Sequence, residues 1–274
     1  MRRTAFLVLI LSAIIVFSCR EDALLGPTEE LIVVEAFLYA HEPVDDIHLT
    51  LMLPLDAEEG VQALTVNDAS IRLVKDGQSY ALMPTGGDSG YYHYAGSDLT
   101  VEADDRFTLE IDYKGELTTA ETIVPTAPEN VALSNATMRV PTLEDIRFGG
   151  VDVSDLFITV NWQNEEGNLF YVTVENIDAN PTPVNSALPD FVRSRRFPPT
   201  SRDEFRLSFQ QFTHFGTHLV KVYRVNREYA DLYETQEQDS RSLNEPLSNI
   251  ENSLGIFSAF HSNVDSLFLE VVVY

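Results

Sequence analysis

The sequence predicts a mainly β protein, with an N-terminal immunoglobulin-like β-sandwich followed by a second β-rich domain that contains one amphipathic helix. Many short segments alternate apolar and polar residues, which places one face of each segment in a core. Turn signals such as Asp76-Gly77 and Lys114-Gly115 separate these segments. Two prolines in the stretch 125–128 stiffen and extend the chain, so we place the domain boundary there.

The first predicted domain covers residues 31–125. Leu31–Tyr39 is a compact apolar run of strand length, and Ile47, Leu49, Leu51 and Leu53 alternate with other residues. Phe107–Tyr113 repeats this alternation before the Lys114-Gly115 turn. Six or seven short strands within ~95 residues are typical of an immunoglobulin-like sandwich.

The second predicted domain covers residues 126–274. Leu156–Trp162 and Phe170–Val174 flank a turn, and Ser266–Tyr274 forms a closing strand. Between them, residues 225, 229, 232 and 233 are Val, Tyr, Leu and Tyr, which is the stripe of an amphipathic helix. We expect this helix at about 226–238, with Asn226 as a possible N-cap.

Residues 1–18 have the features of a lipoprotein signal peptide. Arg2 and Arg3 precede the run Ala5–Phe17, whose 13 residues are apolar except for one serine. This run is too short for a transmembrane helix, which needs ~20 residues, but it suits the core of a signal peptide. The sequence Val-Phe-Ser-Cys at 16–19 resembles a bacterial lipobox and predicts lipid attachment at Cys19.

Cys19 is the only cysteine of the chain, which favours this interpretation over a general secretory signal with an incidental cysteine. Residues 19–30 would then be the lipidated cysteine and a short tether to the outer membrane. Arg20-Glu21-Asp22 resembles the surface-export signal of Bacteroidota lipoproteins, and the alternative is a charged linker.

Composition excludes several classes of protein. The chain of 274 residues is 44% hydrophobic and 22% charged, which excludes general disorder. Its 43 acidic and 18 basic residues give a net charge of −25, and loss of Arg2 and Arg3 with the signal peptide gives −27. Such a charge repels phosphate backbones, so we expect no nucleic-acid partner. A single cysteine excludes an intramolecular disulfide framework and cysteine-rich metal sites.

An ordered set of segments near the C-terminus carries a family resemblance: Tyr229, Leu232, Tyr233, Asn244-Glu245-Pro246, residues 248–252 (SNIEN) and residues 254–260 (LGIFSAF). The set resembles the C-terminal signature of uncharacterised Bacteroidota outer-membrane lipoproteins that share a domain of unknown function. Ser253 and Ser258 depart from it, because glycine is expected there. The resemblance implies a genetic neighbourhood beside TonB-dependent receptors and no established activity.

No catalytic motif is present, so we expect neither an enzyme nor a cofactor. The sequence lacks G-x-S-x-G, H-E-x-x-H and a glycine-rich phosphate loop. His214 and His218 would lie ~13 Å apart along a strand, which is too far for one zinc ion. Asp152 and Asp155 could help to bind calcium, although a solvated turn is the simpler interpretation, and we predict no metal site.

A long, proline-rich loop is the best candidate for contact with a partner. It spans about residues 178–202 and carries an unusual share of the chain's bases. Arginine and aromatic residues are enriched in the cores of interfaces. In the alternative, these arginines offset the protein's own carboxylates. The candidate partner-binding residues are Phe191, Arg193, Arg195, Arg196, Phe197, Arg202 and Arg206.

We therefore expect a non-enzymatic lipoprotein exposed on the cell surface. It would be an accessory or binding subunit of a TonB-dependent outer-membrane receptor system, in nutrient capture or envelope assembly. One alternative is a free-standing adhesin for carbohydrate or peptide, with Tyr91, Tyr92 and Tyr94 as candidate aromatic contacts. A second alternative is a hydrolase with an unrecognised site. We also expect the apolar segment Asn249–Phe260 to stabilise the second domain.

Overall fold

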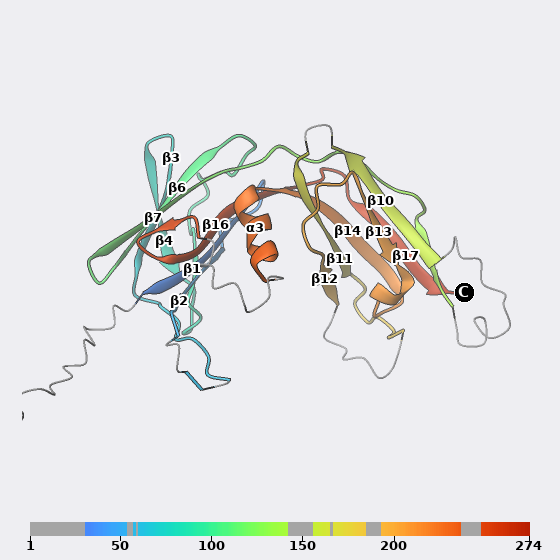
Figure 1. Ribbon diagram of the computed structural model, residues 1–274, viewed down its shortest axis with the longest axis horizontal. Helices are drawn as coiled ribbons and strands as arrows, with labels where there is room; N and C mark the ends of the chain where they lie inside the picture. The colour runs from blue at the N-terminus through green and yellow to red at the C-terminus, as the bar shows by residue number, and fades with distance from the viewer. Residues whose placement is uncertain are drawn as a thin grey trace, which may run out of the picture. The chain divides into compact units, whose positions relative to one another are not determined.

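The computed structural model confirms a mainly β fold (Figure 1). Residues 31–274 form one compact unit. The predicted helix is present as α3 (Arg227–Gln236). Within this unit the structure describes residues 31–53, 57–58, 60–141, 156–164, 167–184, 193–236 and 248–274.

The first sandwich closes around one hydrophobic core, because strand β4 pairs with both of its walls. Buried Leu73, Phe107 and Ile111 from one wall and Val34 and Leu49 from the other meet in this core. One wall consists of β16 (Leu254–Ser262), β1 (Ile32–Tyr39), β2 (Asp46–Leu51) and β5 (Tyr91–His93). After β4 (Gln78–Pro84), the other wall consists of β3 (Ser70–Lys75), β6 (Arg106–Tyr113), β7 (Glu116–Ile123) and β15 (Ile250–Glu251).

The second sandwich has its own core, in which Trp162, Phe170, Val220 and Leu269 are buried. Its larger wall consists of β12 (Ser194–Arg196), β11 (Leu169–Asn176), β14 (Gly216–Val225), β17 (Leu267–Val273) and β9 (Thr137–Val140). Its smaller wall consists of β13 (Glu204–Ser208), β10 (Phe157–Gln163) and β8 (Glu129–Leu133), and a short 3₁₀ turn, η3 (Phe209–Gln211), follows β13.

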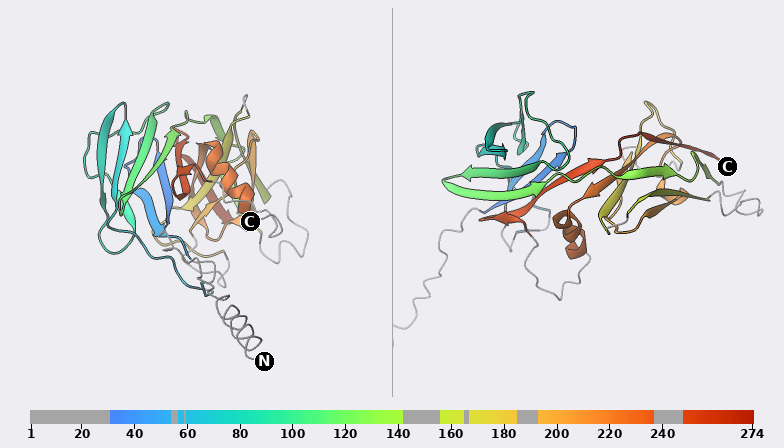
Figure 2. Two further views of the ribbon diagram at one scale, coloured as in Figure 1. Left: turned by 60° about the vertical axis from the view of Figure 1, so that its left-hand side comes forward. Right: turned by 90° about the horizontal axis from the view of Figure 1, so that it is seen from above.

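Strand β16 joins the two sandwiches. It pairs in parallel with β1 from Val33↔Leu254 to Tyr39↔Phe260, and its end pairs with β14 (Figure 2). Gly255 has φ +119°, and a Cβ there would lie 1.9 Å from the carbonyl oxygen of Val34. Glycine is therefore required where β16 approaches β1 most closely.

From the sequence we expected the segment Asn249–Phe260 to stabilise the second domain. The structure shows that it also contributes to the first sandwich. Ile250, Phe257 and Ala259 belong to the core of the first sandwich, although they follow the linker at Pro125–Pro128. Phe257 is fully buried, as its apolar character predicted. The division of the chain into domains at residue 126 stays a prediction. Strands β15 and β16, which lie beyond that residue, pair with β7 and β1 of the first sandwich.

An aromatic cluster lies where β1, β11, β14, β16 and α3 meet. Rings of Tyr171 and Tyr223 stack with centroids 4.9 Å apart, and those of Tyr39 and Phe260 stack at 5.1 Å. Tyr229 of α3 packs edge-on against Phe260 at 4.7 Å. The tyrosine-rich helix therefore connects the two sandwiches through stacked and edge-to-face rings.

Candidate partner-binding site

Strand β12 forms the end of the large sheet, beside β11. The backbone N–H of Asn176 donates to the carbonyl oxygen of Arg193 at 2.8 Å. The backbone N–H of Phe197 donates to the carbonyl oxygen of Val172 at 3.0 Å. Hydrogen bonding alternates along an antiparallel strand, so the backbone groups of Ser194 and Arg196 point away from β11. An edge of this kind is a template for pairing with another chain.

Arg193 and Arg195 are exposed at this edge. Arg193 donates to the carbonyl oxygen of Asp178 at 3.5 Å. Neither arginine forms an ion pair with any residue that the structure describes. Two guanidinium groups thus face solvent on an acidic protein, and such groups are well suited to bind carboxylates through two bonds.

Arg196 points to the opposite face of the sheet, because side chains alternate along a strand. Its guanidinium lies 5.5 Å from the ring centre of Tyr171, and its Nη1 donates to the Tyr229 hydroxyl at 3.3 Å. Burial raises the pKa of Tyr171 and of Tyr39, so both hydroxyls are protonated at neutral pH. Arg196 therefore packs on the aromatic cluster and is separated from the Arg193–Arg195 pair.

The other predicted residues have different surroundings from that pair. Phe197 is buried and packs against Phe205 at 4.7 Å between ring centroids, so it is a core residue. The Arg206 guanidinium covers the ring of Phe157 at 4.0 Å. Arg202 is exposed just before β13, and its carbonyl oxygen accepts from Trp162 Nε1 at 3.1 Å. Phe191 lies outside the described residues.

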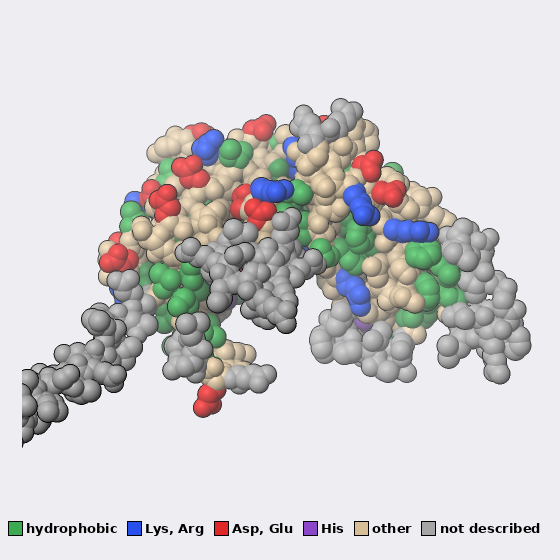
Figure 3. Space-filling model, in the orientation of Figure 1, with side chains coloured by type: hydrophobic (Ala, Val, Ile, Leu, Met, Phe, Trp, Pro, Cys, Tyr) green, Lys and Arg blue, Asp and Glu red, His purple; other side chains and the backbone are tan. Residues whose placement is uncertain are grey.

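The structure therefore divides the predicted arginine loop into three places. Arg193 and Arg195 share the open edge, Arg196 contacts the aromatic cluster, and Arg202 and Arg206 belong to the smaller wall around β13. Figure 3 shows separated basic side chains, in blue, over the second sandwich. The compact candidate site is the β12 edge with Arg193 and Arg195.

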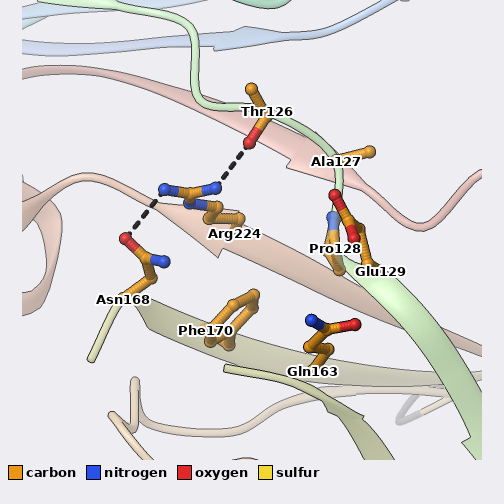
Figure 4. A pocket seen from close by; sticks show the side chains of 8 residues that line it. All are labelled: Thr126, Ala127, Pro128, Glu129, Gln163, Asn168, Phe170 and Arg224. Carbon is orange, nitrogen blue, oxygen red and sulfur yellow. Dashed lines mark hydrogen bonds between the residues drawn. The ribbon is translucent and has the colours of Figure 1, made fainter. Parts of the chain in front are cut away.

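Sequence reasoning missed a pocket of about 420 Å³ beside the linker (Figure 4). The Arg224 guanidinium donates to Thr126 Oγ1 at 2.5 Å and to Asn168 Oδ1 at 2.7 Å. Phe170, Gln163 and other residues complete the lining. Arg224 thus ties the linker to the β10–β11 turn, and two of its N–H donors already have protein acceptors. The prolines around Thr126 were the sequence signal for this region.

Two other sets of residues from the sequence do not form ligand sites. His214 and His218 are both buried: His214 Nδ1 lies 2.9 Å from Thr213 Oγ1, and His218 Nδ1 donates to the Gly216 carbonyl oxygen at 3.0 Å. Among the described residues, no cluster of His, Cys, Asp and Glu has the geometry for a metal ion. Asp152, Asp155 and Cys19 lie outside those residues.

The three clustered tyrosines have separate surroundings. Tyr92 is buried and donates its hydroxyl to the Val66 carbonyl oxygen at 3.0 Å. Tyr94 donates to Asp98 at 2.6 Å, and the exposed ring of Tyr91 stacks on His48 at 4.4 Å. They do not form one continuous aromatic platform.

Comparison with known proteins places the chain in an uncharacterised family. Residues 20–265 match the domain of unknown function DUF4249, and the chain belongs to this family. No curated protein matches it. Solved structures similar to the chain include the FN1–FN3 domains of chicken CNTN1, at 11% identity and a TM-score of 0.25. That match covers 70% of this chain and 59% of the other. In the part of the chain that the structure describes, no helix is long and apolar enough to cross a membrane.

Proposed function

We propose that the protein is a non-enzymatic lipoprotein of the Bacteroidota outer membrane, anchored through Cys19 and exposed on the cell surface. It acts as an accessory or binding subunit of a TonB-dependent receptor system, in nutrient capture or envelope assembly. The observation that carries the proposal is the open β12 edge, where Arg193 and Arg195 are exposed without an ion pair to any described residue.

The anchor follows from the chemistry of the N-terminus. Two or three acyl chains at Cys19 provide stable attachment, whereas one chain binds membranes only marginally. Cleavage before Cys19 leaves residues 20–30 between the lipid and the first strand. The folded part is thus held close to other outer-membrane proteins, which raises its effective concentration for a partner there.

The partner has an acidic surface at the contact. The mature chain carries a net charge of −27, so most acidic surfaces are repelled. The β12 edge offers an approach where Arg193 and Arg195 provide the opposite charge. An extended acidic segment of the partner would hydrogen-bond to the outward backbone groups of Ser194 and Arg196 and reach these guanidinium groups.

Metabolic labelling tests the anchor. A clickable fatty-acid analogue should label the wild-type protein expressed in a Bacteroidota host and leave Cys19→Ala unlabelled. Outer-membrane fractionation of both proteins should show the variant released from the membrane. Equal labelling of the two proteins would contradict the anchor, and an intact β-rich circular dichroism spectrum of the variant would exclude misfolding.

Affinity purification tests the partner. The lipidated protein, crosslinked in cells and recovered from solubilised outer membranes, should bring down a TonB-dependent receptor. Recovery of such a receptor at the level seen with an unrelated lipoprotein bait would contradict the accessory role.

A further inference from the structure

The loop between β2 and β3 exposes an apolar patch, which we define as Met52, Leu53, Val61 and Leu64. These side chains are 38–69% exposed. They make up four of the twelve large hydrophobic residues exposed in the described part of the chain. Single exposed apolar residues are ordinary, but four of them on one loop make this loop a candidate interaction site.

The base of the loop is fixed beside the start of the folded unit. The amide of Met52 donates to the carbonyl oxygen of Leu31 at 2.8 Å, and the amide of Leu51 donates to that of Leu64 at 2.8 Å. Ile32 pairs with Leu51 in the β1–β2 register. The base of the loop that carries the apolar patch therefore lies beside Leu31, the first residue of the folded unit. Figure 1 shows the loop, in blue to cyan, leaving the end of β2.

The tether limits how far this point can be from the membrane. Residues 20–30 separate Cys19 from Leu31. A fully extended chain of this length reaches ~40 Å at most, and a flexible one spans much less on average. The tether thus keeps the Leu31 end of the folded unit within this distance of the bilayer, and the base of the apolar loop lies beside Leu31.

We propose that the apolar patch inserts into the surface of the lipid bilayer and orients the anchored protein. The inference rests on the proposed anchor at Cys19. Apolar side chains on a surface loop enter the boundary between headgroups and acyl chains, and tethering by lipid makes weak insertion effective. The same loop carries three acidic residues, Asp56, Glu58 and Glu59, so the insertion we propose is confined to the headgroup boundary.

A fluorescence experiment tests the insertion. Lipid attachment blocks the sulfur of Cys19, so Leu64→Cys adds the one free thiol of the lipidated chain. This variant, labelled with an environment-sensitive dye, is reconstituted into phosphatidylcholine vesicles with or without acyl-chain spin labels. Zwitterionic lipid is chosen because the mature chain is strongly acidic. The matched control is Val264→Cys, an 82% exposed apolar position between β16 and β17.

We expect the spin labels to quench the dye in the Leu64→Cys protein and leave the Val264→Cys protein unquenched. Vesicle flotation separates the two hypotheses. Protein that fails to float contradicts the anchor, whereas protein that floats with an unquenched Leu64→Cys dye overturns the insertion. A blue shift of the dye emission that appears only at high protein density, without quenching, would mean that the apolar patch contacts a second copy of the chain. That result would also overturn the proposed insertion.

Discussion

The two sandwiches use their basic residues differently. In the first sandwich, Arg72 forms a cross-strand ion pair with Glu110, and Arg106 forms one with Glu121. Lys75 Nζ lies 2.5 Å from Asp105 Oδ2. In the second, Arg193 and Arg195 at the β12 edge form no ion pair with a described residue. The comparison teaches that the surroundings of these basic side chains, and not their number, separate those that pair within the fold from those that a proposed partner could reach.

The sandwiches also differ in how they are completed. The second is built from strands that all lie after residue 128, whereas the first needs β15 and β16 from the far end of the chain. Pairing across such a separation in sequence closes a large loop, and the burial of apolar side chains must offset the entropy lost. The first sandwich should therefore be the one more sensitive to changes in residues 250–260.

The largest effect is expected for Phe257→Ala. Phe257 is fully buried in the core of the first sandwich, so its removal leaves a cavity as well as a loss of apolar burial. We expect a loss of ~3–5 kcal/mol in the free energy of unfolding, measured by urea denaturation. Phe268→Ala, at an exposed position of the second sandwich, is the control and should change little. An unchanged melting temperature for Phe257→Ala would mean that β16 does not complete the first sandwich.

A smaller difference is expected between Lys75→Ala and Arg195→Ala. The Lys75 ammonium is largely shielded from solvent and donates to both Asp105 and the Thr100 carbonyl oxygen. Its loss should cost about 1.5–3 kcal/mol, as is usual for hydrogen bonds to charged groups. Arg195→Ala should stay within about 0.5 kcal/mol of wild type, because Arg195 is exposed and forms no ion pair with a described residue, and substitutions at such surface positions rarely matter more. If thermal denaturation showed equal losses of stability for Lys75→Ala and Arg195→Ala, the distinction between basic residues that stabilise the fold and those exposed at the β12 edge would be contradicted.

The pH dependence of stability tests two buried histidines. Burial lowers the pKa of His218 in the second sandwich and of His261, whose Nδ1 donates to the Pro125 carbonyl oxygen at 2.9 Å. Both are neutral in the folded protein. As pH falls below about 6.5, the unfolded chain binds protons that the folded state binds less readily, so the free energy of unfolding decreases.

Urea denaturation at pH 7.5 and at pH 5.0 measures this effect. The double variant His218→Gln and His261→Gln should lose less stability between the two pH values than the wild type does. His93→Gln, at a half-buried position, is the control for removal of a histidine. An equal pH dependence in the wild type and the double variant would show that these two side chains do not contribute to it.

The sequence predicted local elements better than their partners. Alternation identified the strands around Leu49 and Leu109, because each has one buried face, and the apolar run around Val172 identified β11, which also buries Tyr171 on its other face. It did not show that β16 would pair with β1, since the period of a strand carries no information on which strand lies beside it. The requirement for Gly255 at that contact became visible only when the Val34 backbone was placed next to it.

The candidate site was predicted in part. The clustering of arginines in the sequence drew attention to β12, but it merged residues that the structure separates. Successive positions on β12 face opposite sides of the sheet, which sends Arg196 to Tyr171 and places Arg195, which is exposed, on the same face as Phe197. The burial of Phe197 follows from the same alternation, because it shares a face with the core residues of β11.

Charge reversal at the β12 edge tests the central claim most directly. The double variant Arg193→Glu and Arg195→Glu replaces the two exposed positive charges of the β12 edge with negative ones. The control, Arg72→Glu with Arg106→Glu, makes the same change of charge on the first sandwich. Both are compared with wild type by quantitative crosslinking and purification from outer membranes, after circular dichroism has shown that they are folded. We expect the β12 variant to lose its receptor partner and the control to retain it. Retention by the folded β12 variant, or equal loss by both, would contradict the account.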